Sequence, residues 1–234
     1  METRIASRIL NDIFDLLLKI RVSENYMVGL REQNKREKLE RIKSSAKTIF
    51  LEKGFDEATT KEIAEHARVG TGTLFNYAAD KRDLIFLIAA DEIDDLVNRG
   101  FSDVPEDLPF LEQLIVVFRH HYQYYHSSRD MGLRLLRELP FYHFENRPQA
   151  KRFGEHYENF RTQLSLLVKT AIEQKKIEPD EDFELVTDVI FSLFSRELRR
   201  WLCDPNPEVE KGLFRLRRYF KLVISGLNPK SDAF

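Results

Sequence analysis

Residues 59–77, with the sequence TTKEIAEHARVGTGTLFNY, decide how this chain folds. Thr59 and Glu62 have the spacing of a capping box, in which each side chain satisfies a free amide at a helix start. A small apolar face follows on the first helix, formed by Ile63, Ala64 and Ala67. Gly70 then interrupts the pattern, because glycine tolerates backbone angles that other residues resist. A second helix is predicted over about 71–77, and two short helices joined near a glycine are typical of a helix-turn-helix.

The residues on either side of this motif support the prediction. Apolar residues recur upstream at helical spacing, at Ile42, Ala46, Ile49 and Phe50, and Gly54 is placed to end that helix. Downstream, Asp80 is suited to cap a further helix that starts at Lys81. We therefore expect three short helices followed by a longer one.

Roughly residues 38–90 resemble the DNA-binding domain of TetR/AcrR-type transcriptional regulators. The positions that carry the resemblance are Ala46, Phe50–Phe55, Thr59, Thr60, Ile63, Ala64, Ala67, Val69, Gly72–Phe75, Tyr77, Lys81 and Leu84. Three positions depart from the family pattern. Arg68 stands where Gly is frequent in the turn, Ala78 where an aromatic residue is usual, and Phe75 where Tyr is commonest.

The resemblance implies which side chains contact DNA. Thr71, Gly72 and Phe75 would face base edges, and Phe75 could contact thymine methyl groups. Residues implied to hold phosphates are Thr60, Thr73, Asn76, Tyr77 and Lys81. A purely structural role is the alternative for Leu74 and Tyr77; we accept it for Leu74 and favour a phosphate contact for Tyr77.

Composition predicts an all-α protein. The chain has 234 residues, with only 9 Gly and 8 Pro, and no stretch alternates apolar and polar residues long enough for a sheet. Helical patterns continue beyond Lys81 to about residue 98, with a loop predicted from Gly100 to Pro109. Further helices are predicted over about 110–126, 131–139, 148–176, 179–201 and 209–227. Apolar stripes of this kind pack as antiparallel bundles.

We expect two domains between two terminal segments. Residues 35–98 would form the N-terminal three-helix helix-turn-helix DNA-binding domain with its linking helix. Residues 99–228 would form a C-terminal helical bundle for ligand binding and dimerisation, and residues 229–234 a tail. Residues 1–34 have two interpretations: an amphipathic helix that packs on the body or on a partner, or a segment before a translation start at Met27.

A cluster of basic residues precedes the motif, although the formal net charge of the whole chain is only −2. Its members are Lys35, Arg36, Lys38, Arg41, Lys43 and Lys47. Glu37 and Glu40 interleave with them, so a solvated helix face is one interpretation. Next to the motif we favour phosphate contact, which needs a local basic patch.

Aromatic and histidine side chains concentrate in two stretches of the bundle, residues 118–126 and 141–144. By resemblance, a small effector would bind among these helices, and a mostly apolar pocket with a few polar groups suits that role. The residues chosen as ligand-binding are Phe118, His121, Tyr122 and Tyr125. An aromatic-rich core is an equally good interpretation of each residue singly.

Metal and catalytic sites have little support. The Glu-x-x-His repeats of di-iron bundles are missing, and the adjacent His120 and His121 point to different faces. Glu155-His156 is an isolated pair on a helix face, and no nucleophile elbow, phosphate loop or dinucleotide fingerprint occurs. The single cysteine, Cys203, excludes an internal disulfide. We expect no cofactor, no membrane span, no enzyme activity and a cytoplasmic location.

The combined expectation is a ligand-responsive, sequence-specific DNA-binding regulator, most often a repressor in this family. It would bind a palindromic operator as a homodimer formed by the last two long helices, where Phe191, Trp201, Leu202 and Phe214 suggest additional apolar surface. The alternatives are a helical-bundle enzyme or carrier with a vestigial DNA-binding domain, and an activator or adaptor.

Overall fold

The structure, a computed structural model, describes residues 30–138 and 148–226. Throughout these ranges the secondary structure is helical, without strands, which confirms the all-α prediction. The chain divides into two compact units at Tyr77/Ala78. Below, the head is residues 30–77 and the body is residues 78–226. The predicted N-terminal extension, the tail after 228 and the aromatic stretch 141–144 lie outside the described residues.

The head contains three helices around a small apolar core. Residues 30–53 form the first helix, which ends at Gly54 with a φ of +79°. The helix-turn-helix follows as α2 (Thr60–His66) and α3 (Thr71–Phe75). The fully or almost fully buried residues are Ile42, Ala46, Ile49, Phe50, Ile63, Ala64, Ala67 and Leu74.

The start of α2 has the predicted capping box. The Thr59 hydroxyl accepts from the Glu62 amide at 3.2 Å, and the Glu62 carboxylate accepts from the Thr59 amide at 3.1 Å. Lys53 pairs with the same carboxylate and ties the first helix to α2. These local contacts fix where α2 begins.

The turn between α2 and α3 has an unusual backbone. Arg68 has a φ of +54°, in the left-handed region that favours glycine. This angle explains why glycine is frequent at the corresponding family position. The second helix is two residues shorter than predicted, because the amides of Asn76 and Tyr77 bond to carbonyls three residues back, and α3 ends at Phe75.

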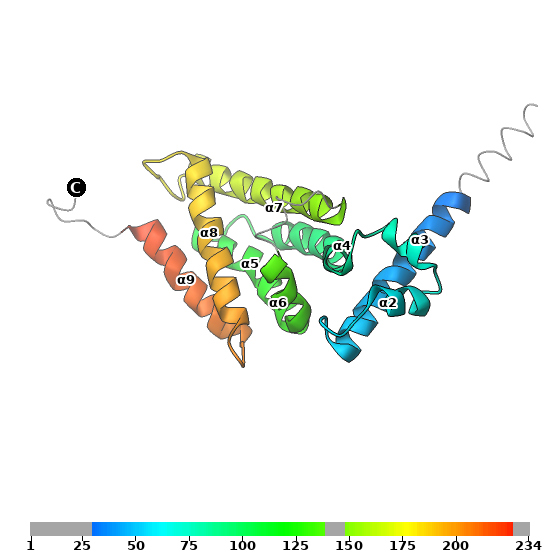
Figure 1. The fold of residues 1–234 in the computed structure, drawn as a ribbon. Coiled ribbons are helices and arrows are strands. Elements are labelled where there is room, and N and C mark those ends of the chain that lie inside the picture. The colour runs from blue at the N-terminus through cyan, green and yellow to red at the C-terminus, as the bar shows by residue number, and fades with distance from the viewer. Residues whose placement is uncertain (1–29, 139–147, 227–234) are drawn as a thin grey trace, which may run out of the picture. The chain divides into compact units, whose positions relative to one another are not determined.

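The body contains six helices in its described part (Figure 1). They are α4 (Lys81–Ser102), α5 (Phe110–Ser127), α6 (Arg129–Glu138), α7 (Pro148–Glu173), α8 (Phe183–Leu202) and α9 (Val209–Ser225). Asp80 caps α4 by accepting from the amides of Arg82 and Asp83, at 2.8 and 2.9 Å. Helix α4 packs on α5 and α7, and α8 packs between α7 and α9.

Glycines set two close approaches that the sequence patterns did not reveal. The predicted loop at Gly100 is wrong, because α4 continues to Ser102. There Gly100 lets α4 approach α5: a Cβ at this position would lie 3.3 Å from the Val117 carbonyl oxygen. In α9, a Cβ at Gly212 would collide with Tyr122 and Trp201. Helix α9 therefore lies unusually close to α5 and α8.

Buried polar contacts join α8 to α9. Glu197 is 1% exposed and accepts hydrogen bonds from Arg196, Arg200 and Arg215. The last of these arginines comes from α9, at 3.0 Å. A buried carboxylate without such partners would be strongly destabilising, so this cluster helps to define how the two helices pack.

Three residues expected at the dimer surface lie elsewhere. Trp201 is 3% exposed and donates from Nε1 to the Glu208 carbonyl at 2.9 Å, and Leu202 is fully buried. Phe191 is partly buried and faces Tyr157 and other body residues instead. The prediction was wrong for these residues because an apolar side chain on a helix can lie either in the internal core or on an external surface. The sequence pattern is the same in both cases.

Candidate nucleic-acid interface and ligand cavity

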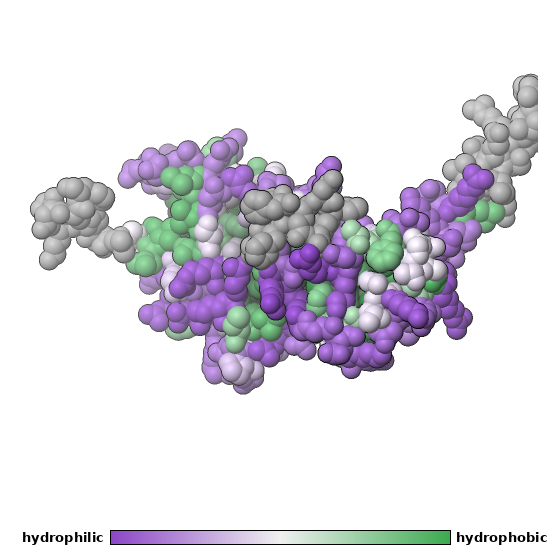
Figure 2. All heavy atoms as spheres, in the orientation of Figure 1, coloured by the Kyte–Doolittle hydropathy of each residue, from purple (hydrophilic) through white to green (hydrophobic). Residues whose placement is uncertain are grey.

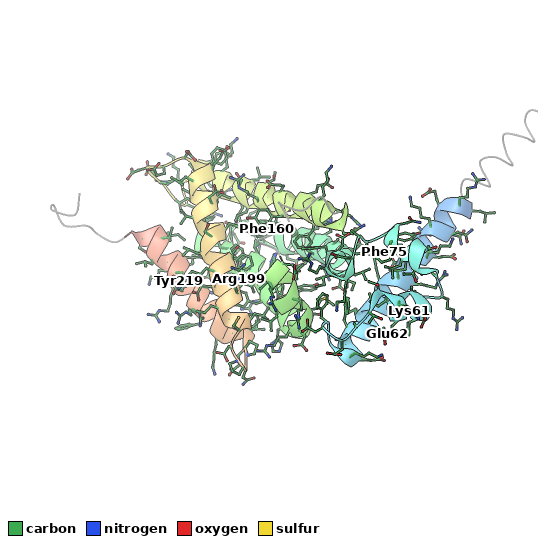
Figure 3. The ribbon with its side chains drawn as sticks, in the orientation of Figure 1. Lys61, Glu62, Phe75, Phe160, Arg199 and Tyr219 are labelled. Carbon is green, nitrogen blue, oxygen red and sulfur yellow. The ribbon has the colours of Figure 1, made fainter. Side chains whose placement is uncertain are left out.

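Helix α3 exposes the residues implied to read bases. Thr71 and Gly72 are exposed, and Phe75 is 48% exposed, whereas Leu74 is fully buried and anchors the helix in the head. Figure 3 shows Phe75 on the α3 segment, together with Lys61 and Glu62 of α2. A Cβ added at Gly72 would meet no atom within 4 Å. The head itself therefore gives no reason for glycine at this position.

The residues implied to hold phosphates have less uniform surroundings. Asn76 is exposed, whereas Thr60, the first residue of α2, and Thr73 are partly buried. The Tyr77 hydroxyl donates to the Lys35 carbonyl oxygen at 3.3 Å, which attaches the end of the motif to the first helix. Lys81 is the first residue of α4 and belongs to the body.

The basic cluster divides into exposed residues and residues with structural contacts. Lys35, Arg36 and Lys38 are exposed. In contrast, Lys43 is 9% exposed and pairs with Glu40 at 3.2 Å, so its predicted place in a phosphate-binding patch is wrong. Arg41 donates from Nε to the Ala67 carbonyl at 3.2 Å, which secures the end of α2.

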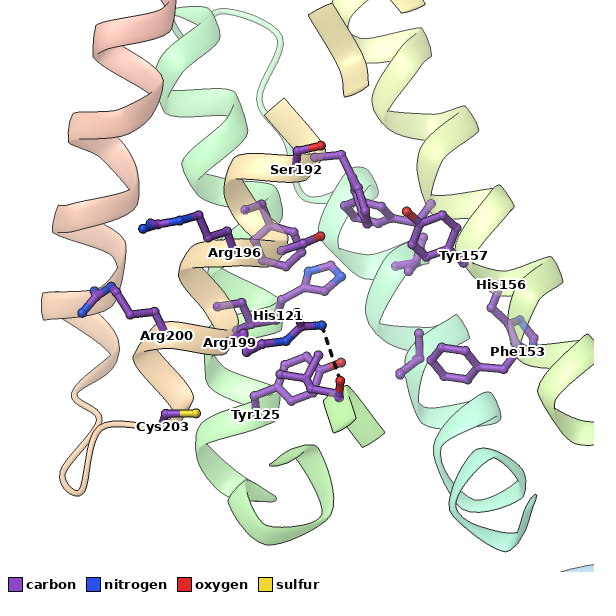
Figure 4. Close-up of a pocket in the computed structure, with 18 residues that line it drawn as sticks. His121, Tyr125, Phe153, His156, Tyr157, Ser192, Arg196, Arg199, Arg200 and Cys203 are labelled. Atoms are coloured by element: carbon purple, nitrogen blue, oxygen red, sulfur yellow. Dashed lines mark hydrogen bonds between the residues drawn. The ribbon is translucent and has the colours of Figure 1, made fainter. Parts of the chain in front are cut away.

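The body contains a cavity of about 720 Å³ (Figure 4). Its walls come from all body helices except α9. The lining side chains are Ile93 and Val97 of α4, His121 and Tyr125 of α5, Leu136 of α6, four residues of α7 and a long face of α8 with Cys203. From α7 come Phe153, His156, Tyr157 and Phe160. The wall is predominantly aromatic and aliphatic, as in sites for apolar small molecules.

Two of the four predicted ligand-binding residues line this cavity. His121 and Tyr125 do, and Figure 4 shows the His121 imidazole directed from α5 into it. Phe118 and Tyr122 instead lie in the core with no exposed surface, where Phe118 stacks on Phe194 at 4.2 Å and Tyr122 packs on Trp201. Neither residue lines the cavity, because this face of α5 is directed toward α8 and α9.

Helix α8 contributes the polar residues that the sequence analysis missed. Arg196, Arg199 and Arg200 all border the cavity, and Arg199 donates to the Leu136 carbonyl of α6 at 3.4 Å. Steps of three and four residues place side chains along one side of a helix. Such steps lead from Arg196 to Cys203, through Arg199 or through Arg200. That spacing was the signal available in the sequence.

The two cavity histidines have different partners. His121 contacts the Val117 carbonyl through Nδ1 at 3.4 Å, and burial lowers its pKa to about 4. His156 on α7 is 9% exposed and pairs through Nδ1 with Asp94 of α4. His120 faces away from the cavity and lies 3.3 Å from Asp103. The adjacent histidines thus point to different faces, as predicted.

Apolar side chains remain exposed on α8 and α9. On α8 they are Leu185 and Val189; on α9 they are Phe214, Leu222, Val223 and Ile224. Phe214 is 64% exposed, as predicted. Figure 2 shows apolar surface over the N-terminal part of α8 and the C-terminal part of α9. None of the helices that the structure describes is long and apolar enough to span a membrane.

Comparison with known proteins identifies the head. Residues 42–88 match the family model of the bacterial regulatory proteins of the tetR family. A fatty acid metabolism regulator protein of Bacillus subtilis is 21% identical over 198 residues, which cover 85% of this chain and all of that protein. The HTH-type transcriptional regulator HbdR of Aromatoleum is 36% identical over 58 residues, a quarter of each chain.

Solved structures extend the likeness to the body. Thermus thermophilus FadR, a TetR-family transcriptional repressor in complex with lauroyl-CoA, has a TM-score of 0.64 at 22% identity, covering 84% of this chain and 98% of that one. Bacillus subtilis FadR in complex with stearoyl-CoA has a TM-score of 0.62 at 18% identity, covering 80% and 98%. Both likenesses show a shared fold. The family match of residues 42–88 identifies a DNA-binding domain of the tetR-family type in this chain.

Proposed function

We propose that the protein is a repressor that binds an inverted-repeat operator as a homodimer and leaves it when a long-chain acyl-CoA occupies the body. The observation that carries this proposal is the aromatic-lined cavity, with three arginines of α8 on its border. Such a site suits a ligand with a long apolar part and an anionic part. The exposed α3 supplies the DNA-binding half of the function.

The proposed base contacts involve Thr71, Gly72 and Phe75, because all three are exposed on α3. None of them can make the bidentate guanine contact that Arg or Lys makes. We therefore expect A·T pairs at the centre of each half-site, read through thymine methyl groups. Thr60, Thr73, Asn76, Tyr77 and Lys81 are the proposed phosphate contacts. They would position the head without specifying sequence.

A dimer follows from the small size of one head. One helix-turn-helix reads only a few base pairs, and two heads on a two-fold axis read an inverted repeat. The exposed apolar residues of α8 and α9 are the proposed interface.

Phe214→Glu should give a folded monomer, because Phe214 makes little contact within its own body. The matched control is Leu51→Glu at a head residue that is 68% exposed, and it should remain a dimer.

The effector assignment combines the cavity with the relatives. Two FadR proteins of this fold are solved with lauroyl-CoA and stearoyl-CoA. In this chain the apolar lining would hold an acyl chain, while Arg199, which is not among the arginines that bind Glu197, would pair with a phosphate of the coenzyme. Guanidinium groups suit phosphate because they offer several hydrogen-bond donors in one plane.

Selection from random DNA duplexes tests the function. Purified protein should enrich sequences with dyad symmetry, and lauroyl-CoA should reduce recovery of those sequences. Free coenzyme A and laurate are the matched controls, since each carries half of the proposed ligand. Enriched sequences without dyad symmetry would contradict the dimer, and recovery unaffected by lauroyl-CoA would contradict the effector.

A further inference from the structure

Two polar atoms of α5 in the cavity wall have no hydrogen-bond partner among the described residues. His121 is 7% exposed and Tyr125 is 5% exposed, and both line the cavity. Within residues 30–138 and 148–226, the His121 Nε2 atom and the Tyr125 hydroxyl make no hydrogen bond. They are four residues apart on α5, so they lie one above the other on one helix face. Neither atom is among the polar atoms that are both closed off from solvent and unpaired, so each is open to a hydrogen-bond partner in the cavity.

The protein fixes His121 as a hydrogen-bond acceptor. Its Nδ1 faces the Val117 carbonyl oxygen, which can only accept, so Nδ1 carries the proton. Burial lowers the pKa of His121 to about 4, and the ring is therefore neutral near pH 7. The rings of Phe160 and Phe194 contact it edge-on, at centroid distances of 5.0 and 5.3 Å. Nε2 thus presents a lone pair to the cavity.

The protein leaves Tyr125 as a hydrogen-bond donor. Burial raises the pKa of Tyr125, so the hydroxyl keeps its proton. Its ring packs against the backbone of α6, where a Cβ at Gly132 would lie 2.5 Å from Cδ1 of the ring. The ring of Tyr124 also contacts it edge-on, at a centroid distance of 5.2 Å. The ring therefore has little freedom to turn its hydroxyl elsewhere.

We propose that His121 and Tyr125 together recognise an effector group that contains a hydrogen-bond donor beside an oxygen acceptor, next to the apolar chain. The donor, an N–H or O–H, binds His121 Nε2, and the oxygen accepts from the Tyr125 hydroxyl. This inference rests on the proposed function, because it names the chemistry of the same cavity. A secondary amide of the pantetheine arm of acyl-CoA fits, and so does a hydroxyl on the acyl chain. The ionised carboxylate of a free fatty acid has no donor.

The test uses pairs of probes that differ only in the donor. N-Dodecylacetamide has an amide N–H where dodecyl acetate has an ester oxygen, and β-hydroxylaurate has a hydroxyl that laurate lacks. Affinities are measured by displacement of a fluorescent fatty acid from the intact protein. The wild type should prefer the donor-bearing member of at least one pair by about tenfold, the value of one hydrogen bond of about 1.4 kcal/mol. The pair that shows the preference identifies the amide or the chain hydroxyl as the source.

Substitutions assign the preference to its residues. His121→Phe keeps an aromatic ring without the acceptor and should abolish the preference, whereas His121→Gln keeps an acceptor and should retain part of it. Tyr125→Phe should weaken the amide and the ester alike, since both have a carbonyl. Thermal unfolding checks that each variant folds.

Several results would overturn the inference. They are equal affinities within both probe pairs of the wild type, or a preference that survives in His121→Phe. If His121→Phe does not fold, the comparison of the probe pairs with the wild type decides the inference by itself. A different result would contradict the proposed function alone. If the protein prefers the donor-bearing probes but lauroyl-CoA does not release operator DNA, the roles of His121 and Tyr125 stand and acyl-CoA is not the effector.

Discussion

Helix α3 and the wall of the cavity use their side chains in opposite ways. On α3, Phe75 and Gly72 are open to solution and contribute little to the packing of the head. In the cavity, Phe194 lines the ligand space and also stacks on Phe118 in the core. A change at either of these two exposed positions of α3 should therefore alter recognition without lowering stability. A change in the cavity should alter both.

The largest effect is expected from Phe194→Ala. Phe194 is 4% exposed, stacks on Phe118 at 4.2 Å and contacts His121 edge-on. Its truncation should lower the free energy of unfolding by about 3–5 kcal/mol, the usual cost of removing a buried aromatic ring. Urea unfolding measures the loss. Leu166→Ala is the control, because Leu166 is 63% exposed on α7, and its change should stay within about 0.5 kcal/mol. Equal losses would show that the cavity wall is not part of the core.

The next effect is expected from Gly72→Ala. A methyl group at Gly72 meets nothing in the free protein, and alanine favours helix over glycine by about 1 kcal/mol. Stability should therefore be unchanged or increased. Operator affinity should fall by roughly tenfold or more, because the methyl group would occupy space that a base edge needs. Fluorescence anisotropy with labelled operator measures the affinity.

Gly132→Ala is the matched comparison in the body. There the added methyl group meets the Tyr125 ring, so this variant should lose stability. At temperatures where it stays folded, its operator affinity should remain near that of the wild type. Undiminished DNA binding by Gly72→Ala would remove Gly72 from the proposed interface.

The sequence predicted the head better than the cavity, for a physical reason. The capping box at Thr59 and Glu62 and the helix end at Gly54 depend on neighbours within a few residues. The side of α5 on which a residue lies does not depend on near neighbours in this way. The same apolar pattern fits a residue that faces α7 and a residue that faces α9. Thus His121 and Tyr125 could not be separated from Phe118 and Tyr122 without the tertiary packing.

The surface of the last two helices shows the same limit. Trp201 and Phe214 are both large apolar residues at helical positions, yet the first is buried and the second exposed. Gly212 contributes to the burial of Trp201, because it lets α9 approach Tyr122 and Trp201 closely. The sequence shows a single glycine among the apolar residues of a helix, but it does not show which neighbouring helix approaches closely at that glycine.

A smaller effect is expected from Arg68→Gly in the turn before α3. Arg68 has a φ of +54°, where a side chain costs roughly 1–2 kcal/mol of stability. Replacement by glycine removes this cost, but part of the gain is lost because glycine has more conformational freedom in the unfolded chain. The head should gain about 1 kcal/mol in stability. Thermal unfolding measures the gain. Lys61→Gly on the exposed face of α2 is the control and should lose stability, since its backbone is helical. A loss of stability in Arg68→Gly would mean that the arginine side chain makes a compensating contact.

The smallest effect concerns pH. Hydrogen bonds from Lys53, then from the Thr59 hydroxyl and amide, lower the pKa of Glu62 from 4.5 to about 2. Because the pKa is lower in the folded state, the contribution to stability is present above pH 4.5 and is lost as pH falls toward 2. Glu62→Gln should flatten the stability profile of the head in this window, measured by thermal unfolding at a series of pH values. The effect should be small and should shrink with salt, because the pair is exposed. A profile identical to that of the wild type would show that the ion pair does not persist in solution.

The most direct test of the account is the coupling between the two regions. Operator affinity is measured with and without lauroyl-CoA, and lauroyl-CoA affinity is measured with and without operator. The account predicts that each ligand weakens the other by the same factor, between about 5-fold and 150-fold. If both ligands bind the wild type and neither changes the affinity of the other, the cavity does not control the DNA-binding head, and the account is wrong.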